Sequence, residues 1–140
     1  MELEGVDEAI RNLEEWGADV KVLMAQSFSS EGMAILDEAM DLCPVDEGKL
    51  QASLYFEMEI MGPFISGIIG SRGCNYAVYV HENLNIQHPF HEHSSRPGHK
   101  PYNCGGQAKF IEVPLLQRAP LIPEHLAEKL RAYSQTMGVK

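Results

Sequence analysis

The amino-acid sequence predicts an α+β fold, in which two N-terminal helices pack on a small, mostly antiparallel β-sheet and a C-terminal helix follows. Apolar residues recur at helical spacing before residue 43 and alternate after residue 53, and a further amphipathic segment lies at 124–137. The 140 residues contain no internal repeat and suit one folding unit, so we expect a single domain over residues 1–140.

The N-terminal part of the chain carries two amphipathic patterns, one at 6–16 and a longer one at 19–42. Acidic residues begin the first pattern, where the helix dipole favours negative charge. Gly17 lies between the two patterns and predicts a break or kink. Weak helix formers at 27–32 predict bending or fraying in the middle of the second helix.

A turn within residues 43–54 joins the helical part of the chain to the alternating part. Pro44 disfavours helical dihedrals at the residue before it, and so ends the second helix. The Asp46 carboxylate is suited to accept hydrogen bonds from the amides that follow and so cap a short turn, in which Gly48 supplies freedom in φ. We expect a structural role for Pro44, Asp46 and Gly48, and we interpret Asp46 as a cap rather than as a catalytic acid.

Two strands are expected after this turn. Apolar and polar residues alternate over 53–60, which gives the strand one apolar face, and Gly62-Pro63 separates it from a second strand at 64–70. We expect these two strands to pair in antiparallel. The period of 76–82 leaves open whether that segment is a strand or a short helix.

The C-terminal part of the chain is predicted to hold one more strand, at 108–113, and then two helical segments. Pro114 suits the first position of a helical turn that runs to Ala119, and Pro123 suits the start of the C-terminal helix. Gly138 is expected to end that helix.

The stretch 83–106 has no apolar period and holds three prolines and most of the histidines. A loop of this length inside a domain is normally functional or disordered. Its side chains favour two interpretations: a metal site, hydrolytic if one coordination position stays open, or a solvated loop whose histidines face water or a partner. The spacing matches no standard zinc pattern, so we favour the second and expect no metal and no cofactor. The zinc-type ligands in the stretch are His88, His91, His93, His99 and Cys104.

No catalytic residues are predicted. Cys74 or Cys104 is a conceivable nucleophile with His81, but no carboxylate is placed to orient such a pair. Glu57 and Glu59 alternate on one face of a strand and indicate a solvated surface. Three cysteines without a C-x-x-C pair do not predict a disulfide framework.

The charge of the chain limits its partners. With 11 Lys and Arg against 20 Asp and Glu, the formal charge is −9, which disfavours sequence-independent binding to nucleic acid. No apolar run is long enough to span a membrane, and the acidic N-terminus lacks the basic start of a secretory signal. We therefore expect assembly in a cytoplasmic compartment and no membrane partner.

A protein interface is the better-supported alternative to an enzyme. Tyr76, Tyr79, His81 and Glu82 bring together amphipathic aromatic and charged side chains, which are common at interfaces. The competing interpretation is that each tyrosine is a core ring with its hydroxyl at the surface. The edges of a small sheet also favour strand pairing between subunits.

Three segments, in order along the chain, resemble elements of the tailed-phage neck proteins. This family is also called tail-completion, head-tail joining or minor capsid proteins, and it includes relatives of the lambda-type minor tail protein Z. Pro44-Val-Asp-Glu-Gly-Lys-Leu-Gln-Ala-Ser-Leu54 is similar to PVDTG-x-L-x-x-S. Tyr76-Ala-Val-Tyr-Val-His-Glu82 is similar to YA-x-YVHE, and Gly106-Gln-Ala-Lys-Phe-Ile-Glu-Val-Pro-Leu115 to G-x-A-K-F-L-E-x-P-L. The chain departs from the family at Glu47, where Thr is usual, and in its longer, histidine-rich insertion.

The resemblance implies a structural protein of the virion, not an enzyme. It implies a homo-hexameric ring in the phage neck, between the head-closure (stopper) ring and the tail terminator or tail tube. Genomic DNA passes through such a ring without specific binding, and we expect part of the −9 charge to line the channel and repel it. We expect the 83–106 loop to reach a neighbouring subunit or ring and to order on assembly. The alternative is a zinc-binding module or metal-dependent enzyme that uses this loop.

Subunit or partner contacts are expected at a small set of residues in and between these segments. They are Tyr76, Tyr79, His81, Glu82, His91, Lys109 and Phe110.

Overall fold

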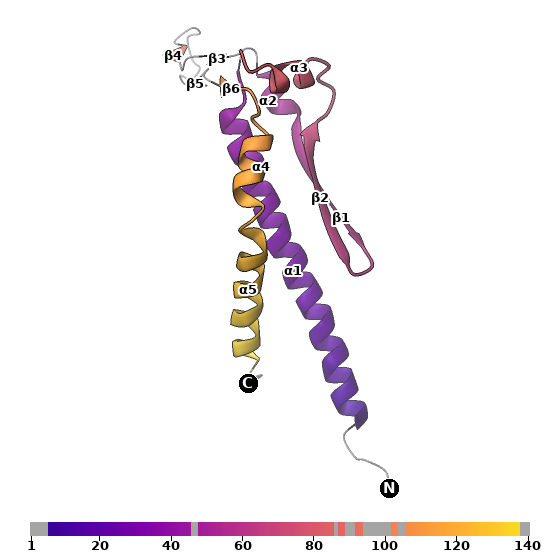
Figure 1. The fold of residues 1–140 in the computed structure, drawn as a ribbon. Helices are drawn as coiled ribbons and strands as arrows, with labels where there is room; N and C mark the ends of the chain where they lie inside the picture. The colour runs from indigo at the N-terminus through magenta and orange to yellow at the C-terminus, as the bar shows by residue number, and fades with distance from the viewer. Residues whose placement is uncertain are drawn as a thin grey trace.

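The computed structural model describes residues 6–45, 48–85, 87–88, 92–93, 102–103 and 106–137. Its centre is one long helix, α1 (Val6–Leu42), which a β-hairpin and the C-terminal helices flank in Figure 1. The hairpin, α4 (Glu112–Arg118) and α5 (Ile122–Thr136) all contact α1. The predicted mixture of helices and antiparallel strands is therefore confirmed, and it is arranged around a single helix.

The expectation of two N-terminal helices is wrong, because α1 is continuous for 37 residues. Gly17 neither breaks nor ends the helix, and the segment 27–32 stays helical. One glycine costs a helix about 1 kcal/mol, which is less than the loss of the hydrogen bonds that a break would remove. Packing against the hairpin and α5 then holds the middle of α1 in place.

The turn after α1 agrees with the sequence at Pro44 and Gly48. The helix ends at Leu42, and Gly48 has a φ of 80°, in the left-handed region that favours glycine. Asp46 lies outside the described residues. A short helix, α2 (Lys49–Ser53), follows, so the strand begins one residue later than predicted. The Gln51 side chain of α2 donates a hydrogen bond of 2.8 Å to the Met40 carbonyl, near the end of α1.

The hairpin consists of β1 (Leu54–Met61) and β2 (Phe64–Ser71), paired in antiparallel as predicted. Its register runs from Leu54 opposite Ser71 to Met61 opposite Phe64. The face of β1 that begins with Leu54 lies toward α1, but burial decreases along the strand and Ile60 is 52% exposed. The hairpin thus extends away from the core and exposes both faces near its tip.

The strand predicted at 108–113 is not formed. Lys109 has a φ of 60°, which a strand does not allow, and its carbonyl accepts a hydrogen bond of 2.9 Å from the Val113 amide. Residues 108–111 are a turn that leads into α4, and Pro114 is the third residue of that helix rather than the first. Among the described residues, no strand pairs with this segment.

The remaining elements are short. The segment whose period was open forms a helix, α3 (Ala77–Glu82), and α5 begins with Pro123 in its first turn as predicted. Gly138 lies outside the described residues. Two antiparallel pairs of two-residue strands complete the fold: β3 (Gln87–His88) with β6 (Gly106–Gln107), and β4 (Glu92–His93) with β5 (Tyr102–Asn103).

The buried core lies at the C-terminal end of α1, where α2, α3, the start of β1 and the 108–111 turn meet (Figure 1). Burial there, and secondarily the neighbouring Cys74 thiol, raises the pKa of Cys43 to about 12, so this thiol stays protonated. Among the described residues Cys43 and Cys74 are both free. The core residues are Leu36, Ala39, Cys43, Leu50, Leu54, Ala77 and Phe110.

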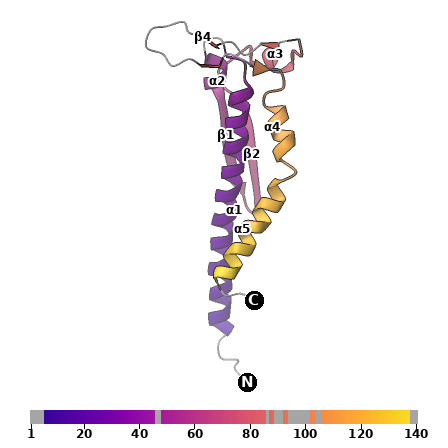
Figure 2. The same cartoon turned by 90° about the vertical axis from the view of Figure 1, so that its left-hand side faces the viewer.

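Polar contacts join the C-terminal helices to α1, and Figure 2 shows α5 running back along it. The Arg118 guanidinium donates to Glu38 at 2.5 and 2.8 Å, and the His125 ring lies 2.9 Å from the Glu31 carboxylate. Further along, the Tyr133 hydroxyl donates to Asp19 at 2.9 Å. No helix in the described part of the chain is both long enough and apolar enough to cross a bilayer.

A tight contact between α1 and the hairpin involves the ring of Phe56. A Cβ atom on Gly32 of α1 would lie 2.2 Å from the Phe56 Cζ, and one on Gly67 of β2 would lie 2.7 Å from the Phe56 Cε2. The ring therefore occupies a slot between two glycines. Phe28 lies beside Gly67 as well, so the ring has little space into which to retreat.

We predict that Gly32→Ala lowers the free energy of unfolding by about 1–3 kcal/mol, because the added methyl group overpacks this slot. The matched control is Gly17→Ala, in the same helix, where nothing lies within 4 Å of the added Cβ. That control should stabilise the protein by up to about 1 kcal/mol through helix propensity. Denaturant unfolding of both variants measures the difference, and equal stabilities would contradict the proposed slot.

Candidate interaction surface at the end of α1

The three segments singled out in the sequence meet at the C-terminal end of α1. Gly106 lies so close to the first segment that a Cβ there would be 2.3 Å from the Pro44 N and Cα atoms. The second and third segments are joined by a backbone hydrogen bond of 2.7 Å from the Lys109 amide to the His81 carbonyl. The Phe110 ring packs edge-on against the His81 ring with centroids 4.9 Å apart. Segments that are distant in the sequence thus form one unit of structure.

A group of charged side chains connects α3 with the start of α4, and we call it the polar cluster: His81, Glu82, Lys109 and Glu112. The Lys109 ammonium lies 2.5 Å from one Glu82 oxygen and 2.8 Å from a Glu112 oxygen. The other Glu82 oxygen is 2.7 Å from the His81 Nδ1, while the Glu112 amide donates to the His81 Nε2 at 3.4 Å. These bonds assign the imidazole proton to Nδ1.

The electrostatics of the polar cluster follow from these contacts. The hydrogen bond from Lys109, and secondarily that from His81, holds the pKa of Glu82 below its usual 4.5. The carboxylates of Glu112 and then Glu82 raise the pKa of Lys109. Both groups therefore stay charged across the neutral range, and the cluster holds α3 against the 109–112 turn.

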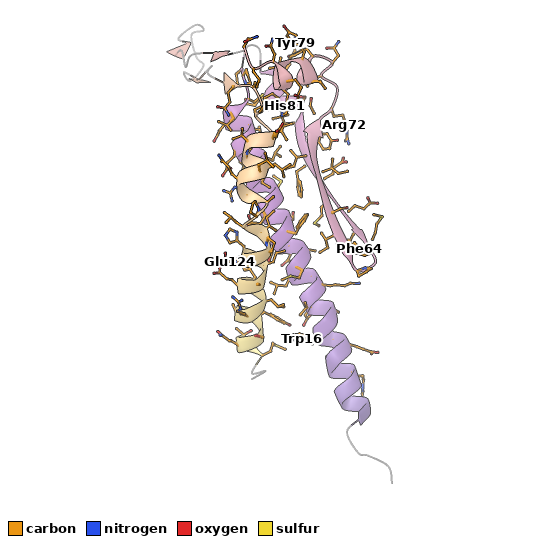
Figure 3. All side chains as sticks on the ribbon, in the orientation of Figure 1. Trp16, Phe64, Arg72, Tyr79, His81 and Glu124 are labelled. Atoms are coloured by element: carbon orange, nitrogen blue, oxygen red, sulfur yellow. The ribbon has the colours of Figure 1, made fainter. Side chains whose placement is uncertain are left out.

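Large apolar side chains on and beside α3 face solvent, and we call this the α3 surface: Tyr76, Val78, Tyr79 and Leu84. Val78 is 74% exposed and Tyr79 is 68% exposed. The Tyr79 hydroxyl accepts a hydrogen bond of 3.1 Å from the Asn83 side chain, which orients the exposed ring. Figure 3 labels Tyr79 and His81 at this end of the molecule. Contiguous exposed apolar groups are typical of surfaces that bind other proteins.

The residues predicted to make partner contacts have different positions in the structure. Tyr76 and Tyr79 are exposed, and His81, Glu82 and Lys109 form the polar cluster beside them. Phe110 is 0% exposed, so this residue belongs to the core of the chain itself and not to a free surface. His91 lies outside the described residues.

Sequence reasoning missed three members of this region. Val78 and Leu84 are apolar residues at an exposed helix and turn, and Glu112 is the second carboxylate bound to Lys109. Only one face of a short surface helix can pack against the core, and the buried residue of α3 is Ala77. The apolar residues on either side of Ala77 therefore cannot all be buried with it. Glu112 was recognisable at helical spacing from Lys109, but the pattern there predicted a strand.

Within the described residues, no three His, Cys, Asp or Glu side chains are grouped to hold a metal ion. The proposed zinc-type ligands in the 83–106 loop are not part of that finding, since His91, His99 and Cys104 lie outside the described residues and the side chains of His88 and His93 are not described. The polar cluster itself consists of mutually paired charges, an arrangement suited to holding two segments together.

Comparisons of the chain with protein families, with curated proteins and with solved structures found no match.

We predict that Gly106→Ala lowers the free energy of unfolding by about 3 kcal/mol, at the upper end of the cost of overpacking. The added methyl group would meet the backbone of Pro44 and Cys43, which cannot rotate aside as a side chain can. The control is Gln107→Ala, the neighbouring exposed residue of β6. Chemical unfolding of both variants tests this, and a loss no larger for Gly106→Ala than for the control would count against the close contact.

We predict that Glu82→Gln lowers the melting temperature near pH 7 and that the difference from wild type disappears once the pH falls below the lowered pKa of Glu82. The pKa of Glu82 is lower in the folded than in the unfolded chain, so its stabilising effect is complete above the unfolded value of 4.5 and is lost as the pH falls through the folded value. Melting curves against pH measure it. Asp37→Asn serves as control, because Asp37 is exposed and has no ion pair among the described residues.

Proposed function

We propose that this chain is a structural component of a tailed-phage virion, a neck protein of the tail-completion or head-tail joining type. In this proposal, copies of the chain form a hexameric ring between the head-closure complex and the tail terminator or tail tube. Genomic DNA passes through the ring without specific binding. The chain is assembled into virions in the host cytoplasm and carries out no catalysis.

One observation carries the proposal. The three segments that resemble the neck family are separated in the sequence, yet Pro44 contacts Gly106 and His81 contacts Lys109 and Phe110. If the resemblance were accidental, there would be no reason for its three parts to share one structural unit. Their convergence supports the view that they encode a common fold element of that family.

The distribution of apolar residues supports assembly. The described residues bury few large side chains, while the α3 surface, the hairpin tip, α4 and the residues that flank α5 leave apolar groups exposed. Exposed apolar area of this extent is typical of proteins that are completed by neighbours. The acidic balance of the chain fits a ring whose channel must not bind DNA, and part of the −9 charge is proposed to line it.

The test is deletion of the gene from the genome that encodes it, followed by electron microscopy of the lysate. We predict DNA-filled heads and complete tails that are not joined, and restoration of joined particles by a plasmid-borne copy.

A plasmid-borne copy that carries both Val78→Asp and Tyr79→Asp should fold but fail to restore joining, because it places charge on the α3 surface. The matched control is Asp37→Lys, Lys129→Glu, two charge changes at exposed positions on α1 and α5. Normal virions from the deletion strain would refute the neck role.

A further inference from the structure

The tip of the hairpin projects apolar side chains into solvent, and the acidic residue Glu59 lies beside them. On the outer face of the hairpin, Met61 lies opposite Phe64, and Glu59 precedes them on the same face. Phe64 is 72% exposed, Met61 and Ile68 are also exposed, and Figure 3 places Phe64 at the end of the hairpin. Strand ends that face water are usually polar, so a tip of this composition is expected to be covered.

A second exposed feature is an open groove of about 830 Å³ between α1 and the inner face of the hairpin. Its lining residues are mostly apolar, and Lys21 is the charged residue among them. Neither Lys21 nor Glu59 forms an ion pair with the described residues. The apolar lining includes Val20, Val22, Met24, Phe28, Met58, Ile60, Ile65 and Leu126.

The tip and the groove are complementary to each other in two respects. The tip is an apolar projection and the groove is an apolar recess. The tip carries Glu59 and the groove carries Lys21, and neither of them forms an ion pair with the described residues. A hairpin cannot fold its own tip into the groove that its inner face forms, because the antiparallel register keeps both strands extended. The two surfaces can therefore meet only between two copies of the chain.

We propose that the hairpin tip of one copy binds in the α1–hairpin groove of the next copy, with Met61 and Phe64 against the apolar walls and Glu59 beside Lys21. Because the tip and the groove are different surfaces of one chain, the contact repeats into a ring or a filament when it is head-to-tail, whereas a reciprocal pair of such contacts closes a two-fold dimer. The contact between copies stands on the geometry of the groove and tip, and its closure into a ring rests on the proposed neck function.

Charge reversal at both partners gives a test in which folding is not at risk. Lys21→Glu sets like charges against each other in every tip–groove contact, and Glu59→Lys does the same with the opposite sign. Both positions are exposed. Each variant alone should associate about tenfold or more weakly than wild type, as measured by analytical ultracentrifugation over a concentration series.

Mixing the two variants should restore association, because each tip then meets a groove of opposite charge in an alternating assembly. The same should hold for a chain that carries both reversals. Matched controls are Asp37→Lys on α1 and Lys129→Glu on α5, which reverse exposed charges away from the groove and should leave association unchanged. Phe64→Ser should weaken association and should not be restored by mixing.

Three results would overturn the proposed contact: wild type that stays monomeric at its highest soluble concentration, single reversals that associate like wild type, or a mixture that remains dissociated. None of them bears on the deletion phenotype. If heads and tails are unjoined in the deletion strain but the charge swap fails, the neck function is supported and the copies must contact each other through different surfaces. A successful charge swap with normal virions from the deletion strain would separate the contact from the neck function.

Discussion

The end of α1 is the constraint on which the rest of the structure depends. Pro44 prevents the helix from continuing, and α2 then reverses the chain so that the hairpin returns along α1. Gly106 packs against Pro44 itself, so the segment that leads into α4 starts from the same point. The hairpin and the C-terminal helices therefore both lead away from the end of α1, and the core lies there.

This arrangement makes the chain long and thin. Toward the other end, α1 has only the hairpin and α5 beside it among the described residues (Figures 1 and 2). The Phe56 ring closes the space between α1 and the hairpin at Gly32, and beyond it the two separate and form the apolar groove. A monomer with one compact end and one open end leaves apolar area for neighbours to cover.

The polar cluster gives the compact end its shape. A strand was predicted at 108–113, but Lys109 adopts a left-handed conformation, with its ammonium group between two carboxylates. Phe110 is thereby turned into the core against His81, and α3 is fixed with its apolar outer face exposed. The buried Phe110 ring and the polar cluster thus together hold α3 in the orientation that exposes the α3 surface.

The sequence by itself determined the elements whose signals are local. Pro44 ends a helix through its own ring, Gly48 takes the positive φ that only its missing Cβ makes easy, and the alternation of 54–61 and its partner strand specifies an antiparallel hairpin. The start of α5 near Pro123 follows from the same kind of rule.

The tertiary structure decided whatever depends on a neighbour that is distant in the chain. Gly17 is compatible with a broken or a continuous helix. The helix is continuous because the hydrogen bonds on both sides stabilise it by more than one glycine destabilises it. Among the described residues no strand pairs with 108–113, and that segment forms a turn and the start of α4. Phe110 could be recognised as part of a motif but not as buried, and the groove has no sequence signal, because it is the space that two separately predicted elements leave between them.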